Sequence, residues 1–227
     1  MVEFLFLDLD DTILDFQKAE HIALRASLQE VGVTPTDAVC ARYRQINKEH
    51  WEALERGKMT RQQVSVGRFA TLFRELAADA DAQLCSKRYI ENLALGNDFL
   101  PGAKEAVERL SRKYKLYIAS NGTKSVQTKR LASTDLEKYF QGIFISEDLE
   151  ADKPSAVFFA RSFARIPGFD SQKAMIVGDS LSSDIQGGIN AGIRTCWVNP
   201  AHKASGAVTP DYEIESIVQL EALLEAI

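Results

Sequence analysis

The chain is poor in cysteine and proline, and it has no long hydrophobic run. Its three cysteines, Cys40, Cys85 and Cys196, have neither the even number of a disulfide framework nor the spacing of a zinc site. We therefore expect buried thiols in a reducing compartment. No stretch approaches the ~18 uninterrupted apolar residues of a membrane-spanning helix, and no signal-peptide pattern opens the chain. These absences predict a cytoplasmic protein with no membrane partner.

The chain also lacks an excess of positive charge. Its 27 lysines and arginines stand against 32 aspartates and glutamates, which gives a net charge of −5. Binding to a nucleic-acid polymer needs a basic face, so the charge argues against that class of partner. With 45% hydrophobic and 26% charged residues, the composition is typical of a globular protein. A length of 227 residues fits one large domain, or a core with a smaller inserted domain.

Five short apolar runs predict the buried strands of a parallel sheet. Helical patterns separate the last four runs, which predicts an α/β fold with a Rossmann-like, doubly wound parallel sheet. The pair Gly187-Gly188 falls in one of these helical patterns and indicates close packing of a helix on the sheet. The five runs are Phe4–Leu9, Leu116–Ser120, Ile143–Ser146, Ala174–Gly178 and Thr195–Asn199.

A cluster of acidic residues follows the first run directly. Asp8, Asp10 and Asp11 lie at the carboxyl end of the predicted strand, where open α/β sheets bind ligands. A single acidic turn is most often only a polar, solvated strand end. Carboxylates this close repel one another, however, so a cation or a reaction that handles anions is a reason to keep them. A hard cation such as Mg2+ prefers carboxylates, waters and phosphate oxygens.

Residues 15–95 contain no convincing strand but several helical patterns. Thr60 and Gln63 form a capping-box signature at the start of one of them. A crossover helix needs only about a dozen residues, so a segment this long implies an inserted helical subdomain. We expect a core of residues 1–14 and 96–227 and an all-helical insert over 15–95. Because the insert starts just after the acidic cluster, we expect it to cover that end of the sheet.

Three further polar elements follow later runs in a fixed order. They are Ser120-Asn121-Gly122, then Lys153-Pro154, then Gly178-Asp179-Ser180 with Asp184 nearby. Each alone has an ordinary explanation, as a turn, a solvated lysine or a helix cap. Together with Asp8-Leu9-Asp10, they resemble the motifs of the haloacid dehalogenase-like (HAD) hydrolase superfamily. The resemblance runs from residue 4 to about residue 200, and in that family a helical cap follows the first motif.

The two aspartates of the first motif suit phosphoryl transfer. Asp8 is the candidate nucleophile, because an aspartate can attack phosphorus and form an aspartyl-phosphate that water then hydrolyses. Asp10 could protonate the leaving oxygen and then activate the water. Haloacid dehalogenases proper lack this second aspartate, so its presence favours phosphoryl chemistry over carbon–halogen cleavage.

The other motif residues are candidates for binding phosphate and metal. The Ser120 hydroxyl and a backbone N–H at Asn121 could hold a phosphate oxygen, with Thr12 as a further contact. Lys153 could neutralise the charge that develops on transfer. By the family resemblance, the side chains of Asp8 and Asp179 and the backbone carbonyl of Asp10 hold Mg2+, with Mn2+ as the alternative. Asp184 orients Lys153 or the metal's waters, or it caps a helix.

The resemblance implies a Mg2+-dependent phosphomonoester hydrolase that acts on a small-molecule phosphate ester. The motifs Leu9-Asp10-Asp11-Thr12 and Ser120-Asn121-Gly122 are similar to those of bacterial pyrimidine 5′-nucleotidases of this superfamily. In the insert, we expect Asn47, Trp51 or Arg68 to contact the leaving group, although each could serve only in packing. We expect a monomer or a weak homodimer.

Other functions compete with this one. A sugar- or glycolate-phosphate phosphatase or a phosphomutase would share the same four elements. A receiver-type signalling domain also forms an aspartyl-phosphate, but it is a single doubly wound unit without a long insert. A catalytically dead scaffold would not need Asp8, Asp10, Lys153 and Asp179 intact.

Overall fold

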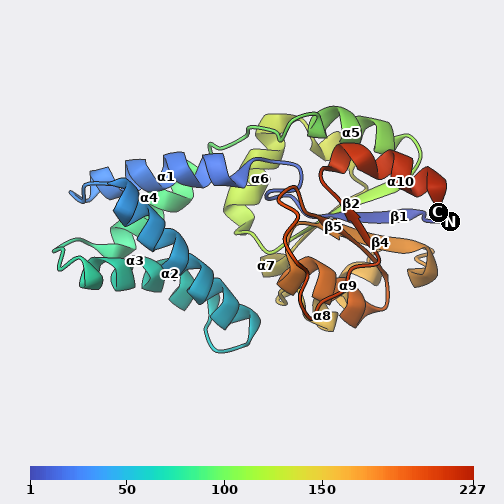
Figure 1. Ribbon diagram of the computed structural model, residues 1–227. Coiled ribbons are helices and arrows are strands. Elements are labelled where there is room, and N and C mark those ends of the chain that lie inside the picture. Colours follow the sequence, from blue (N-terminus) through green and yellow to red (C-terminus); the bar gives the residue numbers. More distant parts are fainter. The chain divides into compact units, whose positions relative to one another are not determined.

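The computed structural model describes residues 1–227, and the chain divides into two compact units. One unit consists of Met1–Phe16 and Asn97–Ile227, and the other consists of Gln17–Gly96. The first contains the whole sheet, and the second is built from helices alone (Figure 1). The fold class expected from the sequence, α/β with an inserted helical subdomain, is confirmed. None of the helices is long and apolar enough to cross a bilayer.

The sheet has six parallel strands in the order β3-β2-β1-β4-β5-β6. The direction of winding reverses between β1 and β4, and such a switch point is where open α/β sheets bind ligands. Five strands match the expected apolar runs, whereas β6 is an additional edge strand of three residues. The strands are β1 (Phe4–Leu7), β2 (Lys115–Ser120), β3 (Gly142–Ile145), β4 (Ala174–Gly178), β5 (Arg194–Val198) and β6 (Tyr212–Ile214).

The two faces of the sheet carry separate hydrophobic cores. Alternate residues of a strand point to opposite faces, so Leu5 and Leu7 join one core while Phe4 and Phe6 join the other. Helices α5 (Ala103–Ser111) and α10 (Leu220–Ala226) cover the leucine face, and α8 (Ala156–Phe163) covers the phenylalanine face (Figure 1). Each fully buried leucine or phenylalanine contributes roughly 1.5–3 kcal/mol. Burial on both faces fixes the positions of the strand ends.

The remaining helices of this unit lie in the connections between strands. Helix α6 (Lys124–Thr134) follows β2, α7 (Ser146–Leu149) follows β3, and a π-helical turn, η3 (Leu181–Ile185), joins β4 to α9 (Gln186–Ala191). Short 3₁₀ turns complete the connections: η1 (Glu137–Tyr139), η2 (Ser171–Lys173) and η4 (Ile217–Gln219).

The expected close packing at Gly187-Gly188 is found in α9. A Cβ atom at Gly188 would lie 2.4 Å from Cγ2 of Ile176 and 2.6 Å from Cγ2 of Thr195, both in strands of the sheet. Glycine is therefore needed for α9 to lie this close to β4 and β5.

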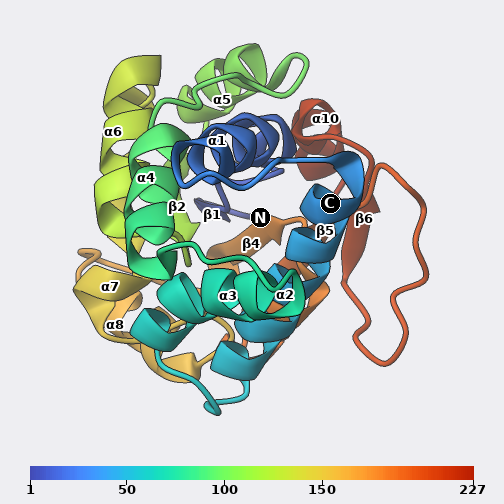
Figure 2. The ribbon, with the colours of Figure 1, turned by 90° about the vertical axis from the view of Figure 1, so that its left-hand side faces the viewer.

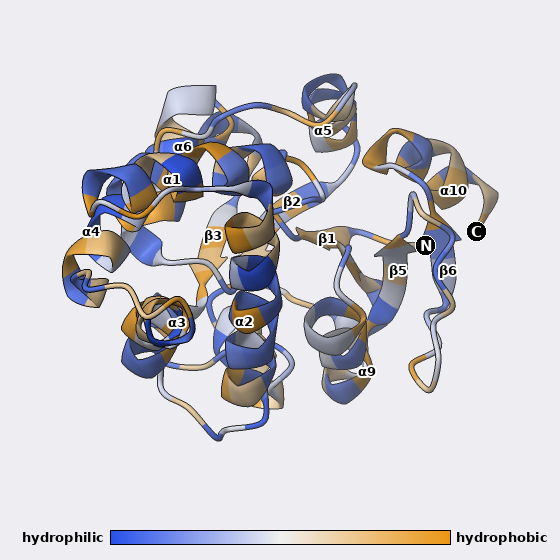
Figure 3. Cartoon of the chain, turned by 60° about the vertical axis from the view of Figure 1, so that its left-hand side comes forward, coloured by the Kyte–Doolittle hydropathy of each residue, from blue (hydrophilic) through white to orange (hydrophobic).

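The helical unit consists of four helices around an aromatic core. Helix α2 packs against α3, and α3 packs against α4 (Figure 2). Tyr43, Phe69 and Tyr89 are buried, with ring centroids 5.1–5.9 Å apart. Each helix carries hydrophobic and hydrophilic stretches side by side, as expected for an amphipathic bundle (Figure 3). The helices are α1 (Phe16–Glu30), α2 (Asp37–Glu55), α3 (Arg61–Glu75) and α4 (Ala82–Leu93).

Two local predictions agree with the structure. The Thr60 hydroxyl accepts a bond from Gln63 N–H while the Gln63 side chain accepts one from Thr60 N–H, which is the expected capping box of α3. The three cysteines are all buried and unpaired, as the sequence analysis anticipated for structural thiols.

We predict that the same substitution has opposite effects at two helical glycines. Gly188→Ala should destabilise the protein by ~1–3 kcal/mol, because its methyl group would overpack the contact between α9 and the sheet. Gly67→Ala in α3 meets only His50, at 3.4 Å, so its higher helix propensity should stabilise by up to ~1 kcal/mol. Chemical denaturation of both variants checks this. Equal stability changes would contradict the close packing at Gly188.

Candidate active site

The polar residues singled out in the sequence lie together at the carboxyl edge of the sheet. Asp8 follows β1, Ser120 ends β2 and Asp179 follows β4, so all three lie at or beside the switch point. The backbone N–H of Asp8 donates to the Val177 carbonyl at 2.9 Å, which ties the end of β1 to β4. Asp8 and Ser120 are buried. The fold therefore gathers residues far apart in the sequence into one polar site.

Lys153 is the centre of this site. Its ammonium donates to Oδ1 of Asp8 at 2.8 Å, to Oδ1 of Asp184 at 2.6 Å and to the Ala119 carbonyl at 2.5 Å. All three N–H donors are used, and the side chain is 1% exposed. Burial opposes the charge, but the carboxylates of Asp184 and Asp8 outweigh it and raise the pKa of Lys153 above its usual value. Lys153 is therefore a fixed ammonium that stays charged at neutral pH.

The backbone around Lys153 is held by the side chain of Asn121. The Asn121 amide donates from Nδ2 to the Lys153 carbonyl and accepts at Oδ1 from the Lys153 N–H, both at 2.8 Å. This two-point contact joins the end of β2 to the segment that carries the ammonium. The side chain of Asn121 thus positions Lys153, and its predicted phosphate contact runs through the backbone N–H and stays a prediction.

The hydroxyl of Ser120 is arranged to donate a hydrogen bond. Its Oγ accepts from the Gly122 N–H and from Nε2 of Gln127, each at 3.0 Å. Both lone pairs are then occupied, so the hydroxyl hydrogen is left for another acceptor. Thr12 is fully buried, and its hydroxyl has no hydrogen-bond partner within the chain. A buried polar group of this kind is usually satisfied by water or a bound ligand.

Asp10 is held by two residues that the sequence analysis did not identify. Arg130 forms an ion pair with Oδ1 of Asp10, and Nε2 of Gln127 donates to Oδ2 at 2.7 Å. Both residues lie on the buried face of α6, next to Val126 and Leu131. Polar residues at helical spacing among apolar ones were a signal available in the sequence, but nothing local indicated Asp10 as their partner.

Three carboxylates form a potential metal site. Oxygens of Asp8, Asp179 and Asp184 lie within 4.8 Å of one another. Burial, together with the charges of Asp184 and Asp10, raises the pKa of Asp8 to about 7 even beside Lys153. Burial, with the charges of Asp8, Asp184 and Asp11, raises the pKa of Asp179 to about 9. The single ammonium does not balance this cluster, so a divalent cation fits the donor set.

The three carboxylates differ in how many of their oxygens accept hydrogen bonds within the chain. Asp184 uses both: Oδ1 accepts from Lys153, and Oδ2 accepts from the Ser180 N–H at 3.1 Å. Asp8 uses only Oδ1, so Asp8 and Asp179 suit the predicted role of metal ligands better than Asp184 does. A Cβ atom at Gly178 would lie 2.2 Å from Oδ2 of Asp184, so glycine is required for that carboxylate to reach its position.

The three residues predicted to contact the leaving group lie in the helical unit. Nη1 of Arg68 donates to Oδ1 of Asn47 at 2.8 Å, and its guanidinium lies 4.7 Å from the centre of the Tyr89 ring. Arg61 lies 5.7 Å from the ring centre of Trp51. All three therefore have partners inside the helical unit, and their role in specificity stays a prediction.

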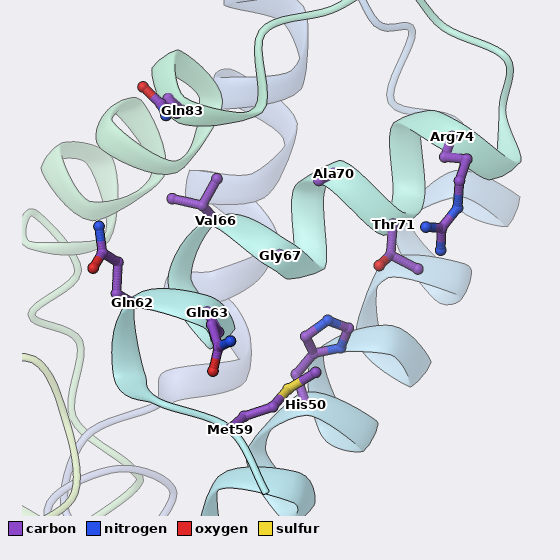
Figure 4. A pocket seen from close by; sticks show the side chains of 10 residues that line it. All are labelled: His50, Met59, Gln62, Gln63, Val66, Gly67, Ala70, Thr71, Arg74 and Gln83. Atoms are coloured by element: carbon purple, nitrogen blue, oxygen red, sulfur yellow. The ribbon is translucent and has the colours of Figure 1, made fainter.

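The helical unit also has an open hollow of about 500 Å³ along α3 (Figure 4). His50 of α2 and Gln83 of α4 contribute to its lining. None of the three predicted specificity residues lines it.

The crowded carboxylates predict an unusual dependence of stability on pH. Folded Asp8 and Asp179 retain protons that the unfolded chain releases above pH ~4, so metal-free protein should lose stability as pH rises from ~4 towards ~9. Asp179→Asn replaces a carboxyl that must take up a proton on folding with a neutral amide. It should therefore raise the melting temperature in EDTA by roughly 2–4 °C for each ~1 kcal/mol recovered, and by more at pH 8.5 than at pH 5. The exposed control Asp79→Asn should change little at either pH. If the Asp179→Asn protein melts at or below the wild-type temperature at pH 8.5, the carboxylates of the site do not destabilise the metal-free fold.

Comparison with known proteins gives the same assignment as the motifs. Residues 5–198 match the haloacid dehalogenase-like hydrolase family. The HAD-hydrolase YfnB of Bacillus subtilis is 40% identical over 221 residues, which cover 97% of this chain and 94% of that protein. A crystal structure of YfnB bound to magnesium matches this structure with a TM-score of 0.94 over 98% of each chain.

Two further relatives have named activities. The pyrimidine 5′-nucleotidase PynA of Streptococcus pneumoniae is 41% identical over 220 residues, covering 96% of this chain and 93% of that protein. The pyrimidine 5′-nucleotidase YjjG of Escherichia coli is 30% identical over 223 residues, covering 98% and 97%. The family match and these relatives extend over nearly the whole chain, and the protein belongs to the haloacid dehalogenase-like hydrolase family.

Proposed function

We propose that the protein is a Mg2+-dependent phosphomonoester hydrolase that works through an aspartyl-phosphate on Asp8. The observation that carries this proposal is the buried ammonium of Lys153, held between Asp8 and Asp184 beside a third carboxylate, Asp179. A cation fixed against a candidate nucleophile, next to a site for a second cation, suits an anionic phosphoryl group. Asp10 beside this site supplies the acid–base group that such a reaction needs.

The first chemical step is the transfer of the phosphoryl group to Asp8. One oxygen of the Asp8 carboxylate attacks phosphorus while the bond to the leaving oxygen breaks, and the Lys153 ammonium on Oδ1 holds the carboxylate in place. The protonated form of Asp10 gives its proton to the leaving oxygen, so an alcohol departs and Asp10 is left as the carboxylate that pairs with Arg130. The hydroxyl hydrogen of Ser120 donates to a phosphoryl oxygen, and Lys153 offsets the charge that develops there.

The second step restores the enzyme. A water molecule attacks the phosphorus of the aspartyl-phosphate, and Asp10 accepts a proton from it. The bond between phosphorus and the Asp8 oxygen breaks, inorganic phosphate leaves, and Asp8 regains its carboxylate. The same carboxyl group thus acts first as an acid and then as a base.

The donor set accounts for the proposed metal dependence. Asp8 and Asp179, with the backbone carbonyl of Asp10, are the groups that would hold Mg2+. When bound, the ion would keep the Asp8 carboxyl charged, although its pKa otherwise lies at about 7, and would offset the charge of the phosphoryl group. The presence of magnesium in the YfnB structure supports this choice of ion.

For the substrate, we propose nucleoside 5′-monophosphates. Two relatives of 41% and 30% identity are pyrimidine 5′-nucleotidases and align with nearly the whole chain, helical insert included. The rival substrates are sugar phosphates and phosphoglycolate. A phosphomutase would interconvert phosphate isomers without releasing inorganic phosphate.

We expect the protein to release phosphate from nucleoside monophosphates, and Asp8→Asn to lower that rate at least ~10³-fold, because an amide cannot attack phosphorus. Chelation with EDTA should abolish the activity, Mg2+ should restore it, and Ca2+ should restore it poorly. Asp79→Asn makes the same substitution at an exposed site and should leave activity unchanged. Full activity after exhaustive chelation, or in the Asp8→Asn protein freed of contaminating phosphatase, would refute the mechanism.

We also expect the helical insert to set the choice of substrate. Alanine at Asn47, Trp51 or Arg68 should change the ranking of nucleotides against sugar phosphates in kcat/KM, because the lost contact belongs to the leaving group. The dependence on Mg2+ should stay the same. Met59→Ala, a control in the same unit, should leave the ranking unchanged. If none of the three variants alters the ranking, specificity lies in other residues.

A further inference from the structure

The side chain of Gln127 contacts both Asp10 and Ser120. Its Nε2 atom lies 2.7 Å from Oδ2 of Asp10 and 3.0 Å from Oγ of Ser120. A primary amide carries two N–H donors, so it can serve both oxygens at once. The proposed acid–base group and the proposed phosphate-binding hydroxyl are therefore held by the same nitrogen.

Arg130 completes this arrangement one helical turn further along α6. Its guanidinium forms an ion pair with Oδ1 of Asp10, and Nη1 donates to Oε1 of Gln127 at 3.1 Å. Both carboxylate oxygens of Asp10 are thus fixed by donors from α6. The Oε1 of Gln127 is also held, which leaves its amide one orientation and directs Nε2 towards Asp10 and Ser120.

Gln127 and Arg130 are more deeply buried than Asp10, the group that they hold. Gln127 and Arg130 are 1% and 0% exposed, whereas the Asp10 side chain is 26% exposed. A partly exposed aspartate has several open rotamers, and the two buried donors select one of them. Asp10 thus remains accessible to a ligand while its orientation is set from the protein side.

We infer that Gln127 and Arg130 are positioning residues for the hydrolysis reaction. They hold the Asp10 carboxyl in the orientation needed for proton transfer, and Gln127 also occupies a lone pair of Ser120 so that its hydroxyl donates to the phosphoryl group. This inference rests on the proposed function, because it assigns the contacts a role in that reaction. Misplacement of a reacting group by about 1 Å can cost ~10²-fold in rate, so such support has a measurable effect.

The alternative is that the contacts serve stability alone. A buried ion pair is weak evidence for either role, because its desolvation cost can match its attraction. A positioning role and a purely stabilising role differ in how the loss of rate depends on the leaving group. Loss of stability alone affects every substrate equally, whereas a misplaced proton donor affects only substrates whose leaving oxygen needs a proton.

The test compares Gln127→Met with the wild-type enzyme in single-turnover measurements of the first step. Methionine is unbranched and fills the same space but cannot donate to Asp10. With a nucleoside monophosphate the rate should fall ~10- to 100-fold, part of the ~10²–10⁴-fold that acid–base catalysis supplies. With p-nitrophenyl phosphate, whose leaving group needs no proton, the rate should fall at least ~5-fold less.

A double-mutant cycle isolates the contact with Asp10. If Gln127 acts through Asp10, Gln127→Met should add little to the loss already caused by Asp10→Asn. Thr134→Val provides the matched control, because it also removes a buried polar group of α6, one that bonds only to backbone carbonyls of the same helix. It should leave the difference between the two substrates unchanged.

Should Gln127→Met fail to fold, Gln127→Asn keeps the amide but shortens its reach, and Arg130→Lys keeps the charge but loses the fixed guanidinium. Both should show the same dependence on the leaving group.

Equal losses of rate for the two substrates, additive losses in the double-mutant cycle, or a variant faster than wild type would overturn the inference. If wild-type protein releases no phosphate, the proposed function fails as well. If the wild-type enzyme is active, Asp8→Asn is inactive and Gln127→Met releases phosphate at the wild-type rate, only the inference about Gln127 and Arg130 fails.

Discussion

The balance of charge around Lys153 is the constraint on which the rest of the site depends. One ammonium, almost wholly buried, lies among carboxylates that are themselves buried. Taking charges out of water costs several kcal/mol each, so a buried ammonium persists only when its N–H donors are bonded and opposite charges lie beside it. The three hydrogen bonds of Lys153 meet that condition, and the remaining negative charge is what makes the site suitable for a metal ion and a phosphate.

Neighbouring residues hold Lys153 and its carboxylate partners in place. Gly178 lacks the Cβ atom that would displace Asp184, and Asn121 clamps the backbone that carries the ammonium. A second charged cluster, Arg130 with Asp10, lies on the α6 side of the site. Gln127 and Ser120 form the link between α6 and the sheet. The site therefore contains two charged clusters, one around Lys153 and one of Arg130 with Asp10, and Gln127 connects the second cluster to Ser120 at the end of β2.

The sheet provides the rigidity that this geometry needs. Its central strands are buried on both faces, so the ends of β1, β2 and β4 cannot shift independently. The long insert leaves the core after Phe16 and returns at Asn97 without interrupting any strand of the sheet. The proposed phosphate-binding residue Ser120 thus lies on a rigid strand end, and Asn121 ties Lys153 to that end. The residues proposed to choose the substrate lie in a separate helical unit.

The sequence by itself determined five of the six strands, the helical insert and the motif residues, because apolar periodicity and the polar residues at strand ends are local features. It did not reveal β6, whose three residues, Tyr212–Ile214, are too few to form a recognisable run. Nor did it reveal the partners of Asp10, because Gln127 and Arg130 are brought to it only by the packing of α6 against the sheet. The raised pKa values of Asp8 and Asp179 likewise arise from burial and from charges distant in the chain. Tertiary structure alone decides such contacts, since neither spacing nor composition encodes which distant side chains will meet.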